Sequence, residues 1–523
     1  MIEPSQPIMS GGELSPVPRR FGAVAGLVAG AVAVSVGMFL AGVIDVVSPI
    51  DAVGSEFIDR VPPWLKELAI QWFGTNDKLA LRVGIFVTLG IAALIVGFLS
   101  ARRIIAGVIG IAAFGLVGTL AALHRPGASG AAALPPLIGA AIGIPLLIQL
   151  LRPTTQRIIE TPGPSKVPLG WDRRRFLVST GSAAAVAVVA GGVAQIVEQR
   201  RVDSIRKAIP AALPAATEVG VDVPADATLS PITPFITPSN DFYRIDTALS
   251  FPRISLSSWK VDIGGMVDKP LTFSYDDLLA RPQVERIVTL CCVSNEVGGE
   301  YISNASFQGV LLADLLKEAG VQSGAQQVYS TSLDGWTCGF PVAVALDGRD
   351  AMIAVGMNGA PLPLEHGFPA RLVVPGLYGY VSATKWLRKI ELTTWDAAAG
   401  FWVPRGWARD APVKTQSRID VPREGEHVAA GPTKIAGIAW AQHRGVERVE
   451  VRVDNGPWQA ARLGTDVTDD AWRQWVLDWN ATPGKHTIQV RATDKTGATQ
   501  TADVAPPDPD GATGYHTRSV KVA

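Results

Sequence analysis

The longest runs of apolar residues lie in the first 200 positions of the chain, at 21–44, 81–99, 104–123, 131–151 and 176–197. Each run is close to the roughly 20 residues that a helix needs to cross a hydrocarbon core of about 30 Å. The pattern therefore predicts five membrane-spanning helices. Glycines four positions apart, at Gly26/Gly30 and Gly139/Gly143, indicate that these helices pack closely.

The apolar pattern becomes shorter and more polar after the fifth run. Residues 201–230 are rich in Pro, Ala and Val and predict a linker. From 231 to 400, β-type runs such as Val328–Ser332 alternate with helical stretches such as Leu311–Ala319, which is typical of an α+β domain. From 401 to 523, alternating apolar and polar residues between turns predict an all-β sandwich. The first four spans form a predicted membrane region at 1–170, and the fifth span lies in a segment at 171–200. The sequence therefore predicts a multi-domain chain.

Charge along the chain predicts its orientation in the cytoplasmic membrane. Basic residues cluster before the first span and in the connections after the second and fourth spans, at Arg19, Arg20, Arg102, Arg103, Arg152, Arg157 and Lys166. Because cytoplasmic loops carry an excess of Lys and Arg, the N-terminus is expected inside, and five crossings then put the domains after residue 197 outside. Over the whole chain, 47 Lys and Arg balance 47 Asp and Glu, so no basic surface favours nucleic acid.

The segment Asp172–Leu177 contains three consecutive arginines before the fifth apolar run. It resembles a twin-arginine export signal, here in an internal position, although an ordinary cluster of cytoplasmic basic residues is the alternative. The twin-arginine route carries folded proteins. The interpretation therefore favours an exported domain that receives a cofactor before it crosses the membrane.

Three cysteines, Cys291, Cys292 and Cys338, are too few for a disulfide framework and do not form a CxxC pair. Cys292 follows a β-type run, where a lone thiol is more often packing than a ligand, but a thiolate at a strand end is also a good ligand for a metal. His366, Arg371 and Lys385 supply donors and charge that suit an anionic phosphate group.

Three motifs together resemble the sulfite oxidase superfamily of molybdopterin enzymes over about residues 230–523. They are NDFYR from Asn240, TLCCVSN from Thr289 and HGFPARLVVPG from His366. The resemblance implies a molybdenum-molybdopterin cofactor with Cys292 as the metal ligand. It implies cofactor contacts at Asn240, Tyr243, Arg244, Thr331, His366, Arg371, Ser382, Thr384 and Lys385. It also implies that residues 401–523 form an immunoglobulin-like domain through which the chain forms a homodimer.

The substrate is left open, because two features of sulfite oxidases are missing. Their RNH motif is replaced by Arg244-Ile245-Asp246, and Val355 stands where they have a tyrosine before the MNG turn. The segment Pro509–His516 also lacks their usual arginine. A small oxyanion or a sulfoxide therefore remains the expected substrate. Asp334 is a candidate for orienting substrate or relaying protons, although a structural turn residue is the equal alternative.

These patterns predict a membrane-anchored oxidoreductase that performs two-electron oxygen-atom transfer. The sequence has no CxxCH haem motif, no iron–sulfur cysteine set and no histidine pair within the spans, so electrons are expected to pass to a separate cytochrome or quinone-linked protein. Two alternatives remain: a non-catalytic, membrane-anchored binding module with a degenerate molybdopterin fold, and a transport unit with a regulatory outer domain. The scarcity of charges within the spans disfavours transport.

Overall fold

The computed structural model describes residues 17–62, 77–152, 173–229 and 232–523, with four single positions between 63 and 76. Arg157, Lys166 and Asp172 of the predicted orientation and export signals lie outside the described residues, as do positions 230 and 231 at the predicted domain boundary. The chain divides into two compact units. The helical unit comprises residues up to Asp203 with Ala248–Arg253, and the β-rich unit comprises Ser204–Thr247 with Ile254–Ala523.

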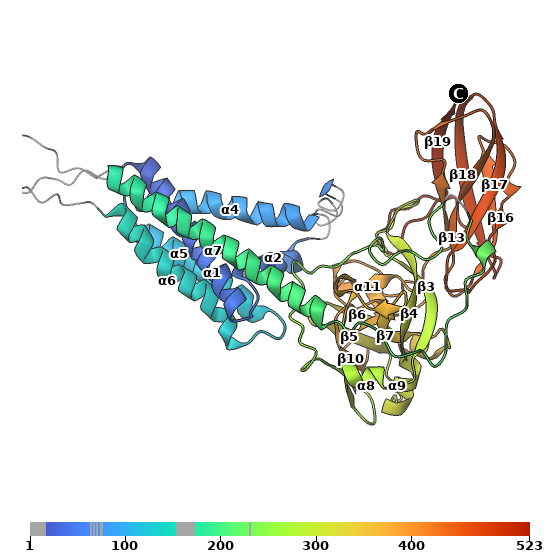
Figure 1. Ribbon diagram of the computed structural model, residues 1–523, viewed down its shortest axis with the longest axis horizontal. Helices are drawn as coiled ribbons and strands as arrows, with labels where there is room; N and C mark the ends of the chain where they lie inside the picture. The colour runs from blue at the N-terminus through green and yellow to red at the C-terminus, as the bar shows by residue number, and fades with distance from the viewer. Residues whose placement is uncertain are drawn as a thin grey trace, which may run out of the picture. The chain divides into compact units, whose positions relative to one another are not determined.

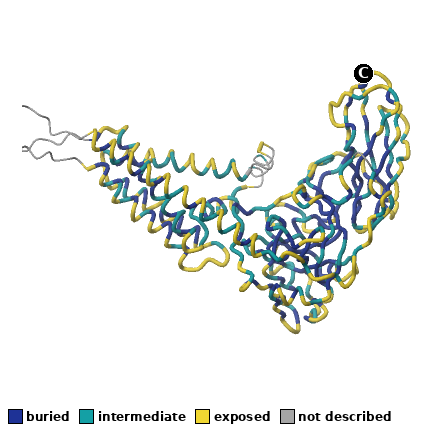
Figure 2. The backbone as a smooth tube through the Cα atoms, in the orientation of Figure 1, coloured by how far each residue is buried: buried dark blue, intermediate teal, exposed yellow. Residues whose placement is uncertain are grey.

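The helical unit is built from long apolar helices (Figure 1). Its elements are α1 (Arg19–Val43), α2 (Pro49–Arg60), α4 (Asp77–Ser100), α5 (Ile104–His124), η2 (Gly130–Ala133), α6 (Leu134–Leu151) and α7 (Arg173–Ala208). Five helical stretches among the described residues are long and apolar enough to cross a membrane, which confirms the predicted number. Only 11% of the apolar window of α4 is buried within the protein, and Figure 2 colours most of this helix as intermediate or exposed.

Close helix packing occurs at the glycines that the sequence singles out. A Cβ added at Gly26 of α1 would lie 2.3 Å from the carbonyl oxygen of Ala93 in α4. A Cβ at Gly139 of α6 would lie 2.4 Å from the carbonyl oxygen of Ala33 in α1. Since real Cβ atoms do not approach backbone oxygens so closely, only glycine permits these two crossings. The structure thus confirms the predicted role of both glycines.

Helix α7 continues beyond the end of the fifth apolar run, to Ala208. The ion pair between Glu198 and Arg201, three residues apart, supports this extension, and Pro210 follows its end. The remainder of the predicted linker follows the β-rich unit as an extended strap. Within it, the backbone N–H groups of Thr217 and Glu218 both donate to the carbonyl oxygen of Gln283. The predicted linker is therefore partly helix and partly a bound strap.

The first part of the β-rich unit contains two five-stranded sheets and several short helices. One sheet has the order β2 (Leu271–Ser274), β1 (Lys260–Gly265), β10 (Leu387–Thr393), β5 (Gln327–Ser332) and β6 (Thr337–Pro341). The other has the order β3 (Val284–Cys291), β4 (Ile302–Leu311), β7 (Met352–Met357) and β8 (Ala360–Pro361), with β9 (Arg371–Val373) also paired to β7. The helices are η3 (Ala225–Ala227), α8 (Tyr275–Leu279), α9 (Leu312–Ala319), α10 (Val342–Leu346), η4 (Leu364–His366), α11 (Gly379–Ser382) and η5 (Val403–Arg405).

The C-terminal part consists of two further sheets. The first has the order β11 (Gln416–Val421), β13 (Gly431–Trp440), β17 (Arg473–Ala481) and β16 (Arg462–Leu463). The second has the order β12 (His427–Val428), β19 (His516–Val522), β18 (Gly484–Asp494), β14 (Val446–Val453) and β15 (Gln459–Ala460). Alternate residues of both sheets, including Ile435, Trp475, Val449 and Ile488, form one buried core (Figure 2). This arrangement agrees with the predicted all-β sandwich.

Candidate cofactor site

Cys292 lies immediately after the last residue of β3 and is 8% exposed. Its backbone N–H donates to the carbonyl oxygen of Tyr301, 2.9 Å away, just before β4 begins. The thiol is therefore attached to a rigid strand end. Burial raises the pKa of Cys292, whereas hydrogen bonds from Ser294 and Val293 favour its thiolate. A bound metal would supply the positive charge that a buried thiolate needs.

The strand that carries the cysteine is fastened to the C-terminal sandwich at Thr289. The N–H of Thr289 donates to the carbonyl oxygen of Asp470 (2.9 Å), and its own carbonyl accepts from Nε2 of Gln442 (3.1 Å). Its hydroxyl accepts from the N–H of Trp472 (2.7 Å) and donates to Oδ1 of Asn304 (2.9 Å). Every polar group of this buried residue thus has a partner, which fixes the strand close to its cysteine end.

The loop after the cysteine is held by the same sandwich. Nη1 of Arg418 donates to the carbonyl oxygen of Gly299 at 3.0 Å. Gly298 has φ of 79°, and a Cβ there would lie 2.3 Å from the ring of His516. Burial, with nearby arginines, lowers the pKa of His516 to about 4, and its neutral Nδ1 accepts from the N–H of Ile419. Sandwich residues therefore fix the chain on both sides of Cys292.

Arg371, the first residue of β9, is only 5% exposed. Its guanidinium donates to the carbonyl oxygens of His366 (3.2 Å) and Leu372 (3.4 Å). No carboxylate forms an ion pair with it in the part of the chain that the structure describes. Burial lowers the pKa of Arg371 to about 10, which shows that its charge is poorly compensated. A buried cation of this kind favours an anionic ligand.

A second buried cation, Lys385, does have a carboxylate partner. Its Nζ lies 2.6 Å from Oδ2 of Asp246 and also donates to the carbonyl oxygen of Glu365 at 3.2 Å. Burial lowers the pKa of Lys385 to about 8, although Asp246 acts in the opposite direction. Arg244 also donates to Asp246, at 3.0 Å. In the sequence Asp246 stands out only as a departure from a motif, so reasoning from the sequence missed its role as the shared counter-charge.

His366 lies near both cations and contacts the segment 237–243. Its Nε2 is 2.8 Å from the carbonyl oxygen of Ser239, so this nitrogen carries the proton. The ring packs edge-on against Phe242, with centroids 5.4 Å apart. Burial, Arg371 and Lys385 lower the pKa of His366 to about 4, and the ring is therefore neutral at physiological pH. With its one N–H bound to Ser239, the neutral ring leaves Nδ1 as a hydrogen-bond acceptor.

The NDFYR segment brings Tyr243 close to the cysteines. Burial and the charges of Cys292 and Cys291 raise the pKa of Tyr243 well above its ordinary value, and Arg371 acts in the opposite direction. A Cβ at Gly379 would lie 3.9 Å from both the Tyr243 hydroxyl and the Cys291 carbonyl oxygen. The phenol therefore lies within the same site. Asn240 is exposed in the preceding turn.

The remaining predicted contacts differ in how accessible they are. Thr331 lies within β5, half-buried and opposite Thr337. The Ser382 hydroxyl donates to the carbonyl oxygen of Tyr378 at 3.0 Å, and the Thr384 hydroxyl lies 2.7 Å from that of Ser330. Both Ser382 and Thr384 are fully buried. The structure therefore places their side chains in internal hydrogen bonds.

Asp334 lies in the turn between β5 and β6. Its Oδ1 accepts from the N–H of Trp336 at 3.1 Å, which is the structural role considered for it. Burial raises the pKa of Asp334, with a further increase from Asp246 and a decrease from Lys385. The charges of Lys385 and Asp246 therefore act on this carboxyl group. Asp334 thus makes a structural contact in the turn and also lies near these two charged residues.

A family model described as oxidoreductase molybdopterin binding domain matches residues 248–402. The chain is 31% identical to human mitochondrial sulfite oxidase over 321 residues, covering 52% of this chain and 58% of that protein. It is 30% identical to sulfite oxidase of Gallus gallus, covering 52% of this chain and 69% of that protein. It is 36% identical to the uncharacterized oxidoreductase YuiH of Bacillus subtilis, covering 29% and 73%. The chain belongs to the sulfite oxidase family. Membership in this family of molybdopterin oxidoreductases implies a molybdenum-molybdopterin cofactor.

The side chains of this family member fit such a group. A thiol at a strand end suits molybdenum, and Arg371 is a buried guanidinium with no carboxylate partner among the described residues, as an anionic pterin would require. His366 and Lys385 lie beside it. The chain spans only 58% of the human sulfite oxidase. The family model does not extend to α1–α7 or to the C-terminal sandwich.

Proposed function

We propose that this chain is a membrane-anchored molybdopterin oxidoreductase that performs two-electron oxygen-atom transfer on a small sulfur oxyanion or a sulfoxide. The observation that carries the proposal is Arg371, a buried cation with backbone carbonyls as hydrogen-bond partners, in the site that also contains Cys292. A buried charge is stable only with a partner, and an anionic cofactor supplies one. Family membership supports the same assignment.

Each side chain then has a separate task. Cys292 binds the molybdenum, and Arg371 and Lys385 hold the anionic part of the pterin, the first by forked hydrogen bonds and the second as a point charge. His366 is fixed by Ser239 and contributes a neutral ring. Asn240, Arg244, Thr331, Ser382 and Thr384 complete the proposed cofactor contacts. When bound, the cofactor supplies the oxygen-atom exchange, and the chain supplies position and charge.

Two groups are placed to act on substrate or protons. Tyr243 has a raised pKa, so it stays protonated at neutral pH and can donate a hydrogen bond to an oxygen atom of the substrate. Burial also raises the pKa of Asp334, which favours a carboxyl that holds and releases a proton. Three departures from sulfite oxidases leave both substrate classes open: the altered RNH motif at Arg244-Ile245-Asp246, the missing tyrosine at Val355 and the missing arginine in Pro509–His516.

The apolar helices and the arginine run support the proposed cell location. Five apolar helices support an anchor in the cytoplasmic membrane, with the N-terminus inside and the oxidoreductase domain on the outer face. Arg173–Arg175 begin α7, and export of the folded domain through a twin-arginine route agrees with cofactor insertion in the cytoplasm. Fusing alkaline phosphatase to the C-terminus tests the orientation, because this reporter is active only outside; an inactive fusion would place the domain inside.

Two partners complete the proposal. A separate cytochrome or quinone-linked protein exchanges electrons with the site, since the sequence contains no haem or iron–sulfur motif of its own. Residues 401–523 form an immunoglobulin-like domain and join two copies of the chain, a proposal that the two-sheet architecture supports. Light scattering of the detergent-solubilised chain distinguishes the dimer from a monomer.

The metal tests the enzyme proposal. The full-length chain purified from molybdate-grown cells should contain stoichiometric molybdenum by mass spectrometry, and Cys292→Ser should remove most of it. Cys338→Ser is the matched control, because Cys338 is a buried thiol that contacts Ser330 and Thr384 inside the fold. A stably folded wild-type protein without molybdenum would favour the alternative, a binding module with a degenerate molybdopterin fold.

The substrate class is tested on the same preparation. Oxidation of sulfite with an artificial electron acceptor and reduction of a sulfoxide with a reduced viologen are measured side by side. Activity in one assay, lost in Cys292→Ser and retained in Cys338→Ser, identifies the class. A molybdenum-loaded chain that is inactive in both assays would refute the proposed sulfur substrate while leaving the cofactor assignment intact.

A further inference from the structure

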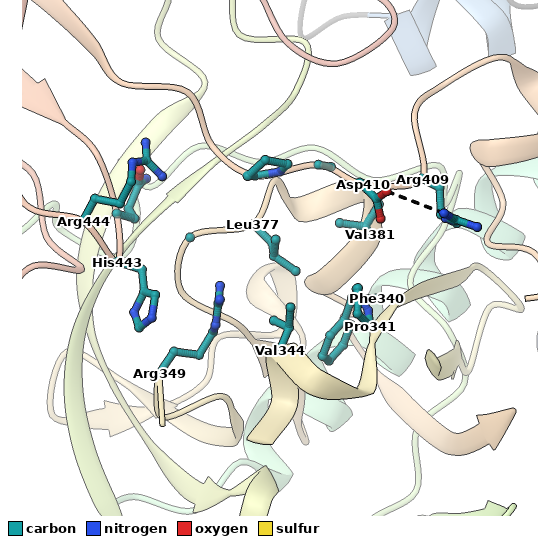
Figure 3. A pocket seen from close by; sticks show the side chains of 14 residues that line it. Phe340, Pro341, Val344, Arg349, Leu377, Val381, Arg409, Asp410, His443 and Arg444 are labelled. Carbon is teal, nitrogen blue, oxygen red and sulfur yellow. Dashed lines mark ion pairs between the residues drawn. The ribbon is translucent and has the colours of Figure 1, made fainter. Parts of the chain in front are cut away.

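A pocket of about 350 Å³ lies in the β-rich unit, where four chain segments meet (Figure 3). Residues of 340–349, 376–381, 409–412 and 442–444 line it. Cys292, Arg371 and Lys385 are not among the lining residues, so the pocket is separate from the candidate cofactor site. Its volume is within the range of small-molecule sites. The proposed oxidoreductase activity does not account for it.

Basic side chains line one end of the pocket. Arg349, His443 and Arg444 lie together on one side of Leu377 in the close view (Figure 3). The carboxylate that pairs with Arg349, Asp347 at 2.6 Å, is not part of the lining. Asp470, 3.6 Å from His443, and Asp494, 3.0 Å from Arg444, also lie outside the lining, so basic side chains line this end and the carboxylates that pair with them do not. At the other end, Arg409 lies 3.6 Å from Asp410 as an ion pair.

Arg444 has hydrogen-bonding capacity to spare. Its Nε is bound to Asp494 at 3.0 Å, and its Nη2 donates to the Val413 carbonyl (2.9 Å) and the Thr415 hydroxyl (3.1 Å). Among the described residues, nothing accepts from its Nη1. The guanidinium is thus held in a fixed orientation by one edge, with two N–H groups free for a ligand. Such a fixed, charged donor is well suited to a carboxylate oxygen.

The wall between the two ends is apolar, with Leu377, Val344 and Phe340 side by side (Figure 3). The lining also contains Gln442, which is fully buried. Its Nε2 donates to the carbonyl oxygen of Thr289, whereas its Oε1 has no hydrogen-bond partner among the described residues. Because Oε1 accepts hydrogen bonds, it contributes no donor for an anion, and Gln442 serves as part of the wall.

We infer that this pocket binds a small organic anion with an apolar body. The carboxylate of the ligand accepts from Arg444, beside Arg349 and His443, and its apolar body covers Leu377 and Val344. A basic end joined to an apolar wall selects for both properties in one molecule, since a bare inorganic anion would leave the apolar surface uncovered. This inference is independent of the proposed oxidoreductase activity.

Benzoate is a suitable probe, and benzamide is its uncharged counterpart of the same shape. Calorimetry on the full-length chain in detergent should show saturable binding of benzoate, and affinity for benzamide should be at least about tenfold lower, the effect of one charge-assisted hydrogen bond. Val344→Trp fills the pocket without changing its charge and should abolish binding. Arg444→Gln should weaken binding of benzoate without weakening that of benzamide.

Two control variants show whether benzoate binds in this pocket or elsewhere on the chain. Arg281→Gln removes an arginine that is paired with Glu318 at 2.6 Å and does not line the pocket, so benzoate binding should be unchanged. Cys292→Ser should also bind benzoate normally; loss of binding there would place the anion at the cofactor and overturn the inference. Equal binding of benzoate and benzamide, or benzoate binding that survives Val344→Trp, would overturn it as well.

Discussion

Arg371→Met should lower the thermal stability of the cofactor-loaded chain but not that of the cofactor-free chain. Burial lowers the pKa of this arginine to about 10, well below its ordinary value. At about 1.4 kcal/mol for each pKa unit, keeping the charge inside the cofactor-free fold costs about 3 kcal/mol. Because the folded pKa is lowered, this cost applies at every pH below about 10 and disappears only as the pH rises further. Methionine keeps much of the length of the side chain and removes the charge.

The loss of hydrogen bonds offsets part of this gain. Arg371 donates to the carbonyl oxygens of His366 and Leu372, and charged hydrogen bonds contribute about 1.5–3 kcal/mol each at good geometry. At 3.2 and 3.4 Å these two bonds are long, so their contribution is at the lower end. We therefore expect the cofactor-free variant to be as stable as the wild type, or more stable by about 1 kcal/mol, a rise in Tm of roughly 2–4 °C.

The assay is thermal unfolding of the full-length chain in detergent, followed by tryptophan fluorescence. Most of the 14 tryptophans lie beyond residue 250, so the signal reports on the β-rich unit. Wild type and Arg371→Met are each purified with the cofactor and, from cells that lack molybdopterin, without it. The wild type should have the higher Tm only when both proteins carry the cofactor. Arg286→Met is the control, since Asp350 and Glu218 pair with Arg286 at 2.7 Å and its loss should destabilise both preparations. Equal destabilisation of both preparations by Arg371→Met would refute the argument.

Three further substitutions test the surroundings of the cofactor. Thr289→Val leaves buried polar partners unsatisfied and should speed alkylation of Cys292 by iodoacetamide in cofactor-free chain, measured by mass spectrometry. Asp246→Asn should lower the pKa of Lys385 further below about 8, so that the cation is lost earlier and molybdenum retention falls at a lower pH than in the wild type. Gly298→Ala forces a Cβ against the ring of His516 and should lower Tm together with molybdenum content.

Each of these has a matched control. Thr272→Val removes an exposed hydroxyl that bonds to Asp262, and should leave cysteine alkylation unchanged. Asp241→Asn alters an exposed carboxylate in the same segment as Asp246, and should not move the pH profile. Gly348→Ala carries similar backbone strain, at φ of 90°, with nothing within 4 Å of the added Cβ. If Gly348→Ala lowers Tm as much as Gly298→Ala does, the contact with His516 is unimportant.

The features that the sequence predicts correctly are those with a local signal. Five apolar helices follow from run length, and strands such as β5 follow from alternation within a few residues. The cofactor family follows from short contiguous motifs around Cys292 and His366. The end of α7 was missed because apolarity stops at residue 197, whereas helix propensity and the Glu198–Arg201 pair continue the helix to Ala208.

Long-range polar contacts leave no such signal. The hydrogen bond from Trp472 to Thr289 joins residues 183 positions apart, and neither residue type indicates a partner. Asp246 likewise looks like a failed motif, although Lys385, 139 positions later, makes it a buried counter-charge. The arrangement of the site therefore depends on tertiary contacts that one sequence cannot reveal. The roles of the individual cofactor contacts remain predictions.

The C-terminal sandwich contacts the segment that carries Cys292. It binds the backbone of β3 at Thr289, before the cysteine, and the carbonyl of Gly299 through Arg418, after it. The proposed joining of two copies through residues 401–523 is therefore separable from these contacts within one chain. A surface variant that separates the two copies should keep its molybdenum, because these contacts lie within one chain. Arg418→Gln should change the electron paramagnetic resonance spectrum of the reduced molybdenum without changing the oligomeric state. An unchanged spectrum in Arg418→Gln would show that the contact between Arg418 and Gly299 does not position Cys292.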